Sequence, residues 1–79
     1  MSVHEIQIPK LGMDTVDCEV VAWRVKVGDR VEKGAELLEV ETEKANVAIE
    51  APVSGVVIQI RAQAGDRVEV GAYVGTIEA

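Results

Sequence analysis

The segment Glu41-Thr42-Glu43-Lys44-Ala45 places a lysine amine, a group that can carry an acyl substituent, inside a short polar stretch. Alternating apolar residues on both sides predict two β-strands, so the polar residues between them predict a hairpin loop with Lys44 at its tip. The lack of Gly and Pro in this loop favours a type I turn. Because a lysine in a turn is usually only solvated, a chemical role for Lys44 must be judged from its surroundings.

The other residues with chemical potential are isolated in the sequence. His4 has no second histidine with which to complete a metal site. Cys18 is the only cysteine and cannot form an internal disulfide, which fits a reducing compartment; we expect it to be a small core or semi-buried residue and not a nucleophile. No pair of general acid and base residues is evident. The sequence therefore predicts no catalytic residues, no metal site and no enzyme activity for this chain by itself.

Composition limits the class of protein. A chain of 79 residues is long enough for one domain, and we expect 1–79 to be a single one. Fifteen Val and six Ile against three Leu and no Phe favour an all-β fold. The net charge of −6 disfavours nucleic acid as a partner. There is neither an apolar run of the roughly 18 residues that span a bilayer nor a basic amphipathic stretch, so a membrane is not expected either.

The chain contains an internal repeat. Residues 28–41 read GDRVEKGAELLEVE and residues 65–78 read GDRVEVGAYVGTIE, so eight of fourteen positions are identical at an offset of 37. Two repeats are too few for a solenoid. They suit a closed fold made of two similar halves related by a pseudo-two-fold axis.

The strand pattern supports the same architecture. Ile58 and Ile60 are expected to face inward, and the repeat assigns the same direction to Val21 and Trp23. Gly-Asp turns follow in both halves. The expected strands are 3–8, 18–25, 30–32, 36–41, 46–51, 55–62, 67–69 and 73–78. Eight short strands predict a flattened barrel or sandwich of two four-stranded antiparallel sheets with few exposed edges.

The repeat also predicts where the lysine lies. At the offset of 37, the turn 42–45 is equivalent to 5–8 and to 79–82, near or beyond the chain ends. We therefore expect the two termini to meet, and the 42–45 turn to lie at the opposite pole. A group attached to Lys44 would then point away from any linker.

Taken together, these segments closely resemble the lipoyl domains of the biotinyl/lipoyl attachment family, almost from end to end. Glu-Thr-Glu-Lys-Ala resembles the family's attachment motif, at the centre of the duplicated sequence. Four further segments match the family's pattern in order and spacing: Pro9-Lys10-Leu11-Gly12-Met13, Trp23 with Val27-Gly28-Asp29-Arg30-Val31, Ala51-Pro52-Val53-Ser54-Gly55, and Gly65-Asp66-Arg67-Val68.

The resemblance implies a carrier domain in which Lys44, flanked by Glu41, Thr42, Glu43 and Ala45, bears covalent lipoic acid as a swinging arm. Its partners would be a lipoyl ligase or transferase, a thiamine-diphosphate 2-oxo acid dehydrogenase, an acyltransferase core and a flavin-dependent dihydrolipoamide dehydrogenase. The arm would carry acyl groups and electrons between their active sites. The resemblance further implies partner recognition by residues of the neighbouring loop and turn: Leu11, Gly12, Met13, Asp14 and Glu43.

The chain departs from the family's pattern in two segments. The family usually carries Glu-Gly where this chain has Asp17-Cys18, which could alter the loop before it. Its commonest turn has Asp in place of Glu43, a change that keeps the charge.

Two other functions remain open from the sequence. A biotinyl carrier domain shares the fold, but its tip resembles Met-Lys-Met rather than Glu43-Lys44-Ala45. An unmodified barrel-sandwich adaptor would have no reason to keep this tip, and such modules usually carry a long helical insertion. We expect the N-terminal part of a longer dihydrolipoamide acyltransferase subunit, in the bacterial cytoplasm or the mitochondrial matrix. Pyruvate, 2-oxoglutarate, branched-chain and acetoin complexes fit equally well.

Overall fold

Eight β-strands make up the regular secondary structure of the chain. The computed structural model describes residues 2–79, and this range contains no helix. The strands are β1 (Val3–Gln7), β2 (Asp17–Trp23), β3 (Arg30–Val31), β4 (Glu36–Glu41), β5 (Asn46–Glu50), β6 (Gly55–Ile60), β7 (Arg67–Glu69) and β8 (Tyr73–Glu78). Each expected strand is present, with its ends within two residues of the expected bounds. The all-β prediction is confirmed.

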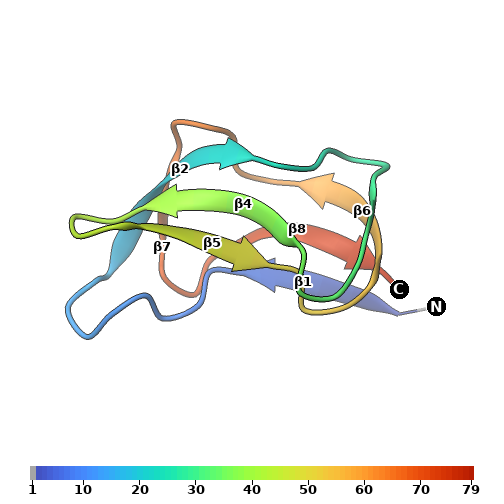
Figure 1. Cartoon of the computed structure of the whole chain (residues 1–79), viewed down its shortest axis with the longest axis horizontal. Helices are drawn as coiled ribbons and strands as arrows, with labels where there is room; N and C mark the ends of the chain where they lie inside the picture. The colour runs from blue at the N-terminus through green and yellow to red at the C-terminus, as the bar shows by residue number, and fades with distance from the viewer. Residues whose placement is uncertain (1) are drawn as a thin grey trace.

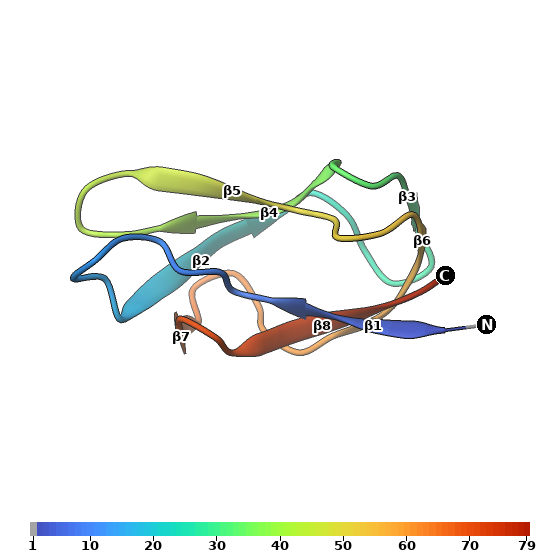
Figure 2. The same ribbon diagram turned by 90° about the horizontal axis from the view of Figure 1, so that it is seen from below.

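The strands form two antiparallel four-stranded sheets that pack face to face (Figures 1 and 2). Their orders are β1-β8-β6-β3 and β5-β4-β2-β7. Each position of one sheet is filled by the repeat equivalent of the other, so both sheets mix strands from the two halves of the chain. The residues between the sheets are almost all branched aliphatics, with Leu37, Leu38 and Ile77 among the largest fully buried. The predicted flattened sandwich with pseudo-two-fold symmetry is confirmed.

The two Gly-Asp turns have the same geometry in both halves. Gly28 and Gly65 adopt φ values of 99° and 94°, a backbone conformation open to glycine at low cost. The carboxylates of Asp29 and Asp66 each accept a hydrogen bond from the backbone N–H three residues earlier, at 3.0 and 2.8 Å. The repeated residues therefore build repeated turns.

The expected direction of two side chains is wrong. Val21 and Ile58 were expected to face inward, but their exposed fractions are 39% and 42%, whereas Val20 and Val57 are fully buried. The cause is a β-bulge at the same place in each half. Val21 is an extra residue of β2 against β4, and Ile58 is an extra residue of β6 against β8.

The bulges restore the expected direction one residue later. Beyond them, Trp23 and Ile60 are partly buried and pack against the core, as expected. Trp23 is not enclosed by the core, because its indole Nε1 reaches the rim of the sandwich and donates a 2.7 Å hydrogen bond to the Ala62 carbonyl. A strict two-residue alternation fails at the bulge because the pleat gains one residue there.

The chain ends meet, as the repeat predicts. Ala79 N donates to Ser2 O at 2.8 Å, and Ser2 N donates to Ala79 O at 3.3 Å. The loop 42–45 lies at the far end of the molecule from both termini (Figure 1). One detail of the prediction is wrong, because 5–8 is not the equivalent of this loop.

The equivalence fails at 5–8 because the connection from β1 to β2 is longer than the equivalent connection from β5 to β6. Ile8 exchanges hydrogen bonds with residues 71 and 72 just as Ala51 does with 34 and 35. Ile8 and Ala51 are 43 positions apart, whereas the other strands are offset by 37. The segment from Ile8 to the bulge at Val21 is therefore six residues longer than the equivalent segment from Ala51 to the bulge at Ile58.

Gly55 is a point where the fold tolerates no side chain. A Cβ there would overlap the backbone oxygen of Glu78 and lie 2.8 Å from Ile77 Cγ2. We expect Gly55→Ala to lower the free energy of unfolding by about 3 kcal/mol through overpacking. Gly65→Ala is the matched control, because its Cβ meets nothing within 4 Å and pays only for its positive φ, about 1 kcal/mol. Urea unfolding of both variants measures the difference, and equal losses would contradict this explanation.

Candidate functional site

Lys44 lies at the exposed tip of the hairpin that joins β4 to β5. All non-glycine residues from 2 to 79 have negative φ, which rules out turns that require a positive φ and leaves the expected type I geometry compatible with 42–45. Glu43, Lys44 and Ala45 are all exposed, and only Thr42 is half-buried. The tip of this hairpin lies at the end of the molecule away from the chain termini (Figure 2), and the exposed Lys44 is part of that tip.

Thr42 holds the tip together through its side chain. Its Oγ1 accepts hydrogen bonds from the backbone N–H groups of Lys44 and Ala45, each at 3.2 Å, and donates to Ala45 O at 2.9 Å. The sequence pattern identifies Thr42 only as a neighbour of the lysine. The signal that could have found this role is the tendency of Ser and Thr hydroxyls to bond backbone groups two or three residues away.

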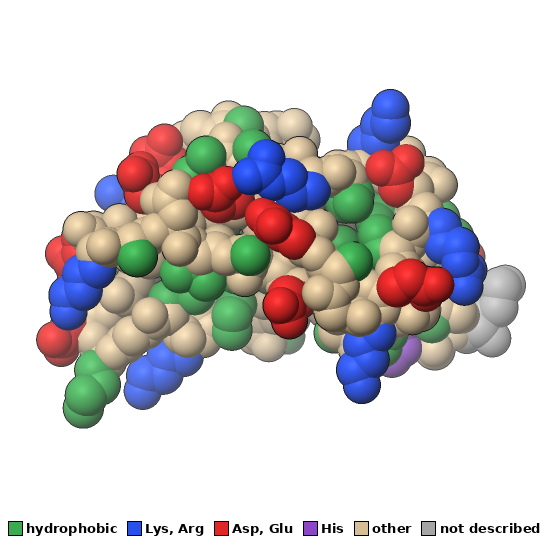
Figure 3. Space-filling view, viewed as in Figure 1, with side chains coloured by type: hydrophobic (Ala, Val, Ile, Leu, Met, Phe, Trp, Pro, Cys, Tyr) green, Lys and Arg blue, Asp and Glu red, His purple; other side chains and the backbone are tan. Residues whose placement is uncertain are grey.

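A polar network braces the same hairpin on the outer surface of its sheet. Asn46 Nδ2 donates to Glu39 Oε2 at 2.6 Å, and the Arg24 guanidinium bridges Glu39 and Glu36. The network connects β4 and β5 to the end of β2. Each exposed ion pair contributes little stability alone, but shared partners restrict the hairpin. Acidic and basic side chains are spread over this face of the molecule (Figure 3).

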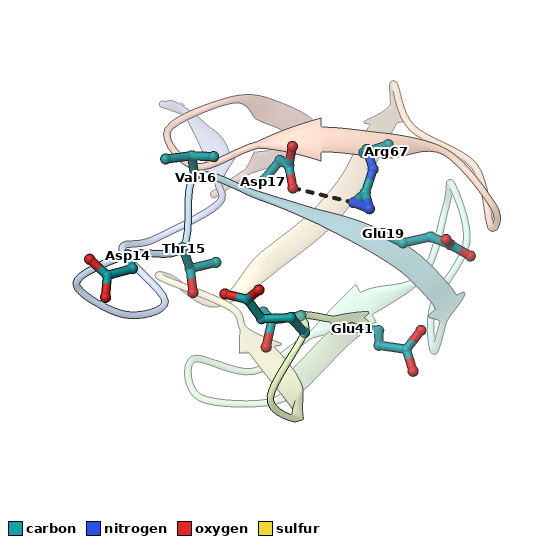
Figure 4. Close-up of a pocket in the computed structure, with 9 residues that line it drawn as sticks. Asp14, Thr15, Val16, Asp17, Glu19, Glu41 and Arg67 are labelled. Carbon is teal, nitrogen blue, oxygen red and sulfur yellow. Dashed lines mark hydrogen bonds and ion pairs between the residues drawn. The ribbon is translucent and has the colours of Figure 1, made fainter.

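The loop between β1 and β2 lies beside the hairpin tip and encloses a groove with it (Figures 2 and 4). The groove has a volume of about 470 Å³. Asp14 and Thr15 line the groove from the loop, and Glu41 lines it from β4 (Figure 4). Met13 on the same loop is 93% exposed, whereas Leu11 packs against the core. The loop is therefore anchored at Leu11 and projects Met13 and Asp14.

The groove is strongly acidic. Five carboxylates and one guanidinium line it: Asp14, Asp17, Glu19, Glu41, Glu43 and Arg67. Arg67 Nη1 pairs with Asp17 Oδ1 at 3.3 Å, which leaves the other carboxylates to set the local charge. A positively charged surface of a partner would be attracted to this end of the molecule.

The family comparison matches nearly the whole chain. The model of the Biotin_lipoyl family, described as biotin-requiring enzyme, matches residues 4–77. The chain belongs to the biotinyl/lipoyl attachment family. The match includes both sheets, the hairpin with Lys44 and the neighbouring loop.

Curated relatives of this biotinyl/lipoyl domain are acyltransferase components. It is 41% identical over 92% of its length to the succinyltransferase component of the 2-oxoglutarate dehydrogenase complex of Bacillus subtilis, and 40% over 90% to the acetyltransferase component of that organism's acetoin cleaving system. It is 37% identical over 99% to the lipoamide acyltransferase component of the branched-chain alpha-keto acid dehydrogenase complex of Pseudomonas aeruginosa. The chain spans only 18–19% of these relatives.

Solved structures show the same fold. The lipoyl domain of the 2-oxoglutarate dehydrogenase complex from Azotobacter vinelandii has a TM-score of 0.77 at 27% identity, with 95% of each chain covered. The Kluyveromyces lactis urea carboxylase has a TM-score of 0.81 at 26% identity, over 99% of this chain and 6% of that one. The fold therefore occurs both in a lipoyl domain and within a carboxylase.

Asp17 and Cys18, where the biotinyl/lipoyl domain departs from the family's pattern, lie in β2 rather than in the loop. Asp17 is the first residue of the strand and Cys18 is fully buried beneath the β7 pairing. Both unusual residues therefore belong to the strand, and the loop before them ends at Val16. His4 is half-buried, with Ser2 Oγ 3.1 Å from its Nε2, and no cluster of three metal-binding side chains occurs within residues 2–79.

The buried Cys18 thiol is not available as a nucleophile. Burial raises the pKa of the thiol above its ordinary value of 9.0, Asp17 adds to the rise, and Arg67 opposes it. We expect an aromatic disulfide reagent to react with the folded domain at least about a hundredfold more slowly than with the unfolded chain. Comparable rates before and after addition of denaturant would contradict the burial.

The same thiol gives stability a pH dependence. The pKa of the thiol is higher in the folded state than in the unfolded chain. Its contribution to the free energy of unfolding is therefore present below pH 9.0 and is lost as the pH rises through and beyond that value. Urea unfolding across this range should show the loss, and Cys18→Ala should lack it.

Within residues 2–79 there is no helix long and apolar enough to cross a membrane.

Proposed function

We propose that this domain is a lipoyl carrier in which Lys44 bears lipoic acid through an amide. The observation that supports this most directly is the position of the lysine, exposed at the tip of a braced hairpin and at the pole opposite the joined termini. A linker from either terminus would leave from the other pole and would not cover the tip. When attached, lipoic acid supplies a disulfide that accepts an acyl group and electrons. The domain's own residues present and orient the arm.

Lipoic acid is favoured over biotin by the tip and by the relatives. Glu43 and Ala45 flank the lysine, where biotin domains resemble Met-Lys-Met. The curated relatives quoted above are acyltransferase components of 2-oxo acid dehydrogenase or acetoin systems. The fold itself does not decide between the two groups, because it also occurs within urea carboxylase. The residues that flank Lys44 and the similarity to these relatives together support lipoylation.

We further propose that the β1–β2 loop recognises the 2-oxo acid or acetoin dehydrogenase that acylates the arm. The pseudo-symmetric β5–β6 connection makes the same link with four residues where the β1–β2 connection has nine, so the fold does not require the extra length. Surface loops that the fold does not require often carry the residues that bind a partner. Asp14 lines the same groove as Glu43, and the neighbouring Met13 is exposed on the same loop, so the loop and the lysine tip can form one contact surface.

The modification can be tested on the isolated domain by intact mass. The domain is incubated with lipoyl ligase, ATP and lipoic acid, and in parallel with biotin ligase, ATP and biotin. We expect one lipoyl-amide increment in the first reaction and no increment in the second. A biotin increment would contradict the proposal. No increment with a ligase that modifies a known lipoyl domain would support the unmodified adaptor instead.

A further inference from the structure

The Thr42 hydroxyl is the centre of the hydrogen bonds that order the hairpin tip. It accepts from the N–H groups of Lys44 and Ala45 and donates to the carbonyl of Ala45. We propose that Thr42 is a positioning residue for modification: its hydroxyl fixes the backbone of Lys44, so that the ligase meets a preformed tip. This inference rests on the proposed function, because it concerns the attachment of lipoic acid to the same lysine.

The tip needs such a clamp because its backbone alone closes it weakly. The tip has none of the positive φ values found in the turns that match the right-handed twist of the two strands they join. Within the described chain, one backbone bond spans the loop, from Thr42 N to Ala45 O at 2.9 Å. The N–H of Ala45, which could return a bond to the Thr42 carbonyl, donates to Thr42 Oγ1 instead. The side chain therefore completes the turn.

The opposite pole provides an internal comparison. Ser2 and Ala79 occupy the places equivalent to Ala45 and Thr42, and they exchange two backbone hydrogen bonds at 3.3 and 2.8 Å. At the lysine pole one of these two bonds is replaced by bonds to a hydroxyl. Equivalent strand ends are therefore joined by two backbone hydrogen bonds at the termini. At the lysine tip they are joined by one backbone hydrogen bond and by the Thr42 hydroxyl.

The hydroxyl also acts at the lysine itself. The Lys44 N–H lies 3.2 Å from Thr42 Oγ1, so the clamp reaches the backbone of the modified residue and not only the base of the turn. The lysine side chain remains exposed and free to move. The clamp should therefore change recognition of the tip by an enzyme, and should leave the amine's access to small reagents unchanged.

The test compares three variants in a steady-state lipoylation assay. Thr42→Val removes the hydroxyl but keeps the branched shape, and Thr42→Ser keeps the hydroxyl. Thr15→Val removes a hydroxyl that lines the same groove but has no hydrogen bond to the turn. We expect Thr42→Val to lower kcat/KM about tenfold, mainly through KM, because the binding-competent tip is less populated. Thr42→Ser and Thr15→Val should stay within about twofold of the wild type.

Two further measurements separate positioning from loss of fold or access. Amide hydrogen exchange at Lys44 and Ala45 should accelerate in Thr42→Val and not in Thr42→Ser. Acetylation of Lys44 by a small activated ester, followed by peptide mass, should be equal in all variants. Rates are normalised to the folded fraction from circular dichroism, and Thr42→Ala replaces the valine variant if that one does not fold.

A wild-type KM in Thr42→Val would overturn the inference while leaving lipoylation intact. Equal losses in Thr42→Val and Thr42→Ser would also overturn it, because the hydroxyl would then not be the active feature. If the wild-type domain is not lipoylated at all, the proposed function fails and this inference falls with it. The wild-type reaction therefore distinguishes the two failures.

Discussion

Replacement of Lys44 by arginine is expected to abolish lipoylation completely. The guanidinium keeps the positive charge and length of the side chain but does not form the amide under ligase conditions, since it stays protonated at any accessible pH. Because Lys44 is exposed and its side chain forms no hydrogen bond or ion pair with residues 2–79, the variant should remain folded with an unfolding free energy within about 0.5 kcal/mol of the wild type. Intact mass after ligase treatment measures the loss.

Lys33→Arg is the matched control for this substitution. Lys33 is also exposed and lies next to a turn, but at the other end of β4. The control should acquire the full lipoyl increment. Modification that persists in Lys44→Arg would move the attachment site to another lysine and would remove the basis of the proposal.

Excision of the β1–β2 loop is expected to separate modification from use by the dehydrogenase. Removal of residues 10–15 joins Pro9 to Val16 and copies the Pro52-Val53 connection of the second half. The lipoylated variant should be acylated about a hundredfold more slowly by its dehydrogenase, as expected when the central contacts of an interface are lost. Lipoylation itself should stay within about twofold, because the hairpin and Thr42 are untouched.

The excision should lower stability only moderately. Leu11 packs against the core, and its loss should cost about 1 to 2 kcal/mol. Met13→Ala with Asp14→Ala, which keeps the loop and Leu11, controls for this cost and should reproduce most of the loss of acylation. Reductive acylation by pyruvate, 2-oxoglutarate, branched-chain and acetoin dehydrogenases measures the effect and identifies the partner. Unchanged rates with the dehydrogenase that acylates the wild type would contradict recognition by the loop.

Much of the fold could be predicted from local sequence because the repeat contains two equivalent sequence segments, each of which predicts the same strands and turns. Gly28-Asp29 and Gly65-Asp66 each predict a turn, and finding the same turn twice places the strands between them. At the offset of 37, the equivalence of 42–45 with 79–82 also predicts that Lys44 lies opposite the termini. These features depend on short-range chemistry: turn residues, branched side chains and alternation.

The direction of Val21 and Ile58 could not be predicted in the same way. A bulge is a mismatch between two strands, and the sequence of one strand does not show how many residues its partner contributes. The repeat reproduced the error in both halves, because it copies the bulge together with the residues. Agreement between the halves was therefore no check on direction.

The sequence by itself determined that the chain is all-β, that it is duplicated, and that Lys44 lies on a polar turn at the pole away from the termini. Only the tertiary structure decided what surrounds that lysine. The acidic groove arises where the β1–β2 loop packs beside a hairpin some thirty residues later, and the Thr42 clamp depends on the three-dimensional path of the turn. Such juxtapositions result from the closure of two sheets, which brings together residues whose local sequences carry no record of one another.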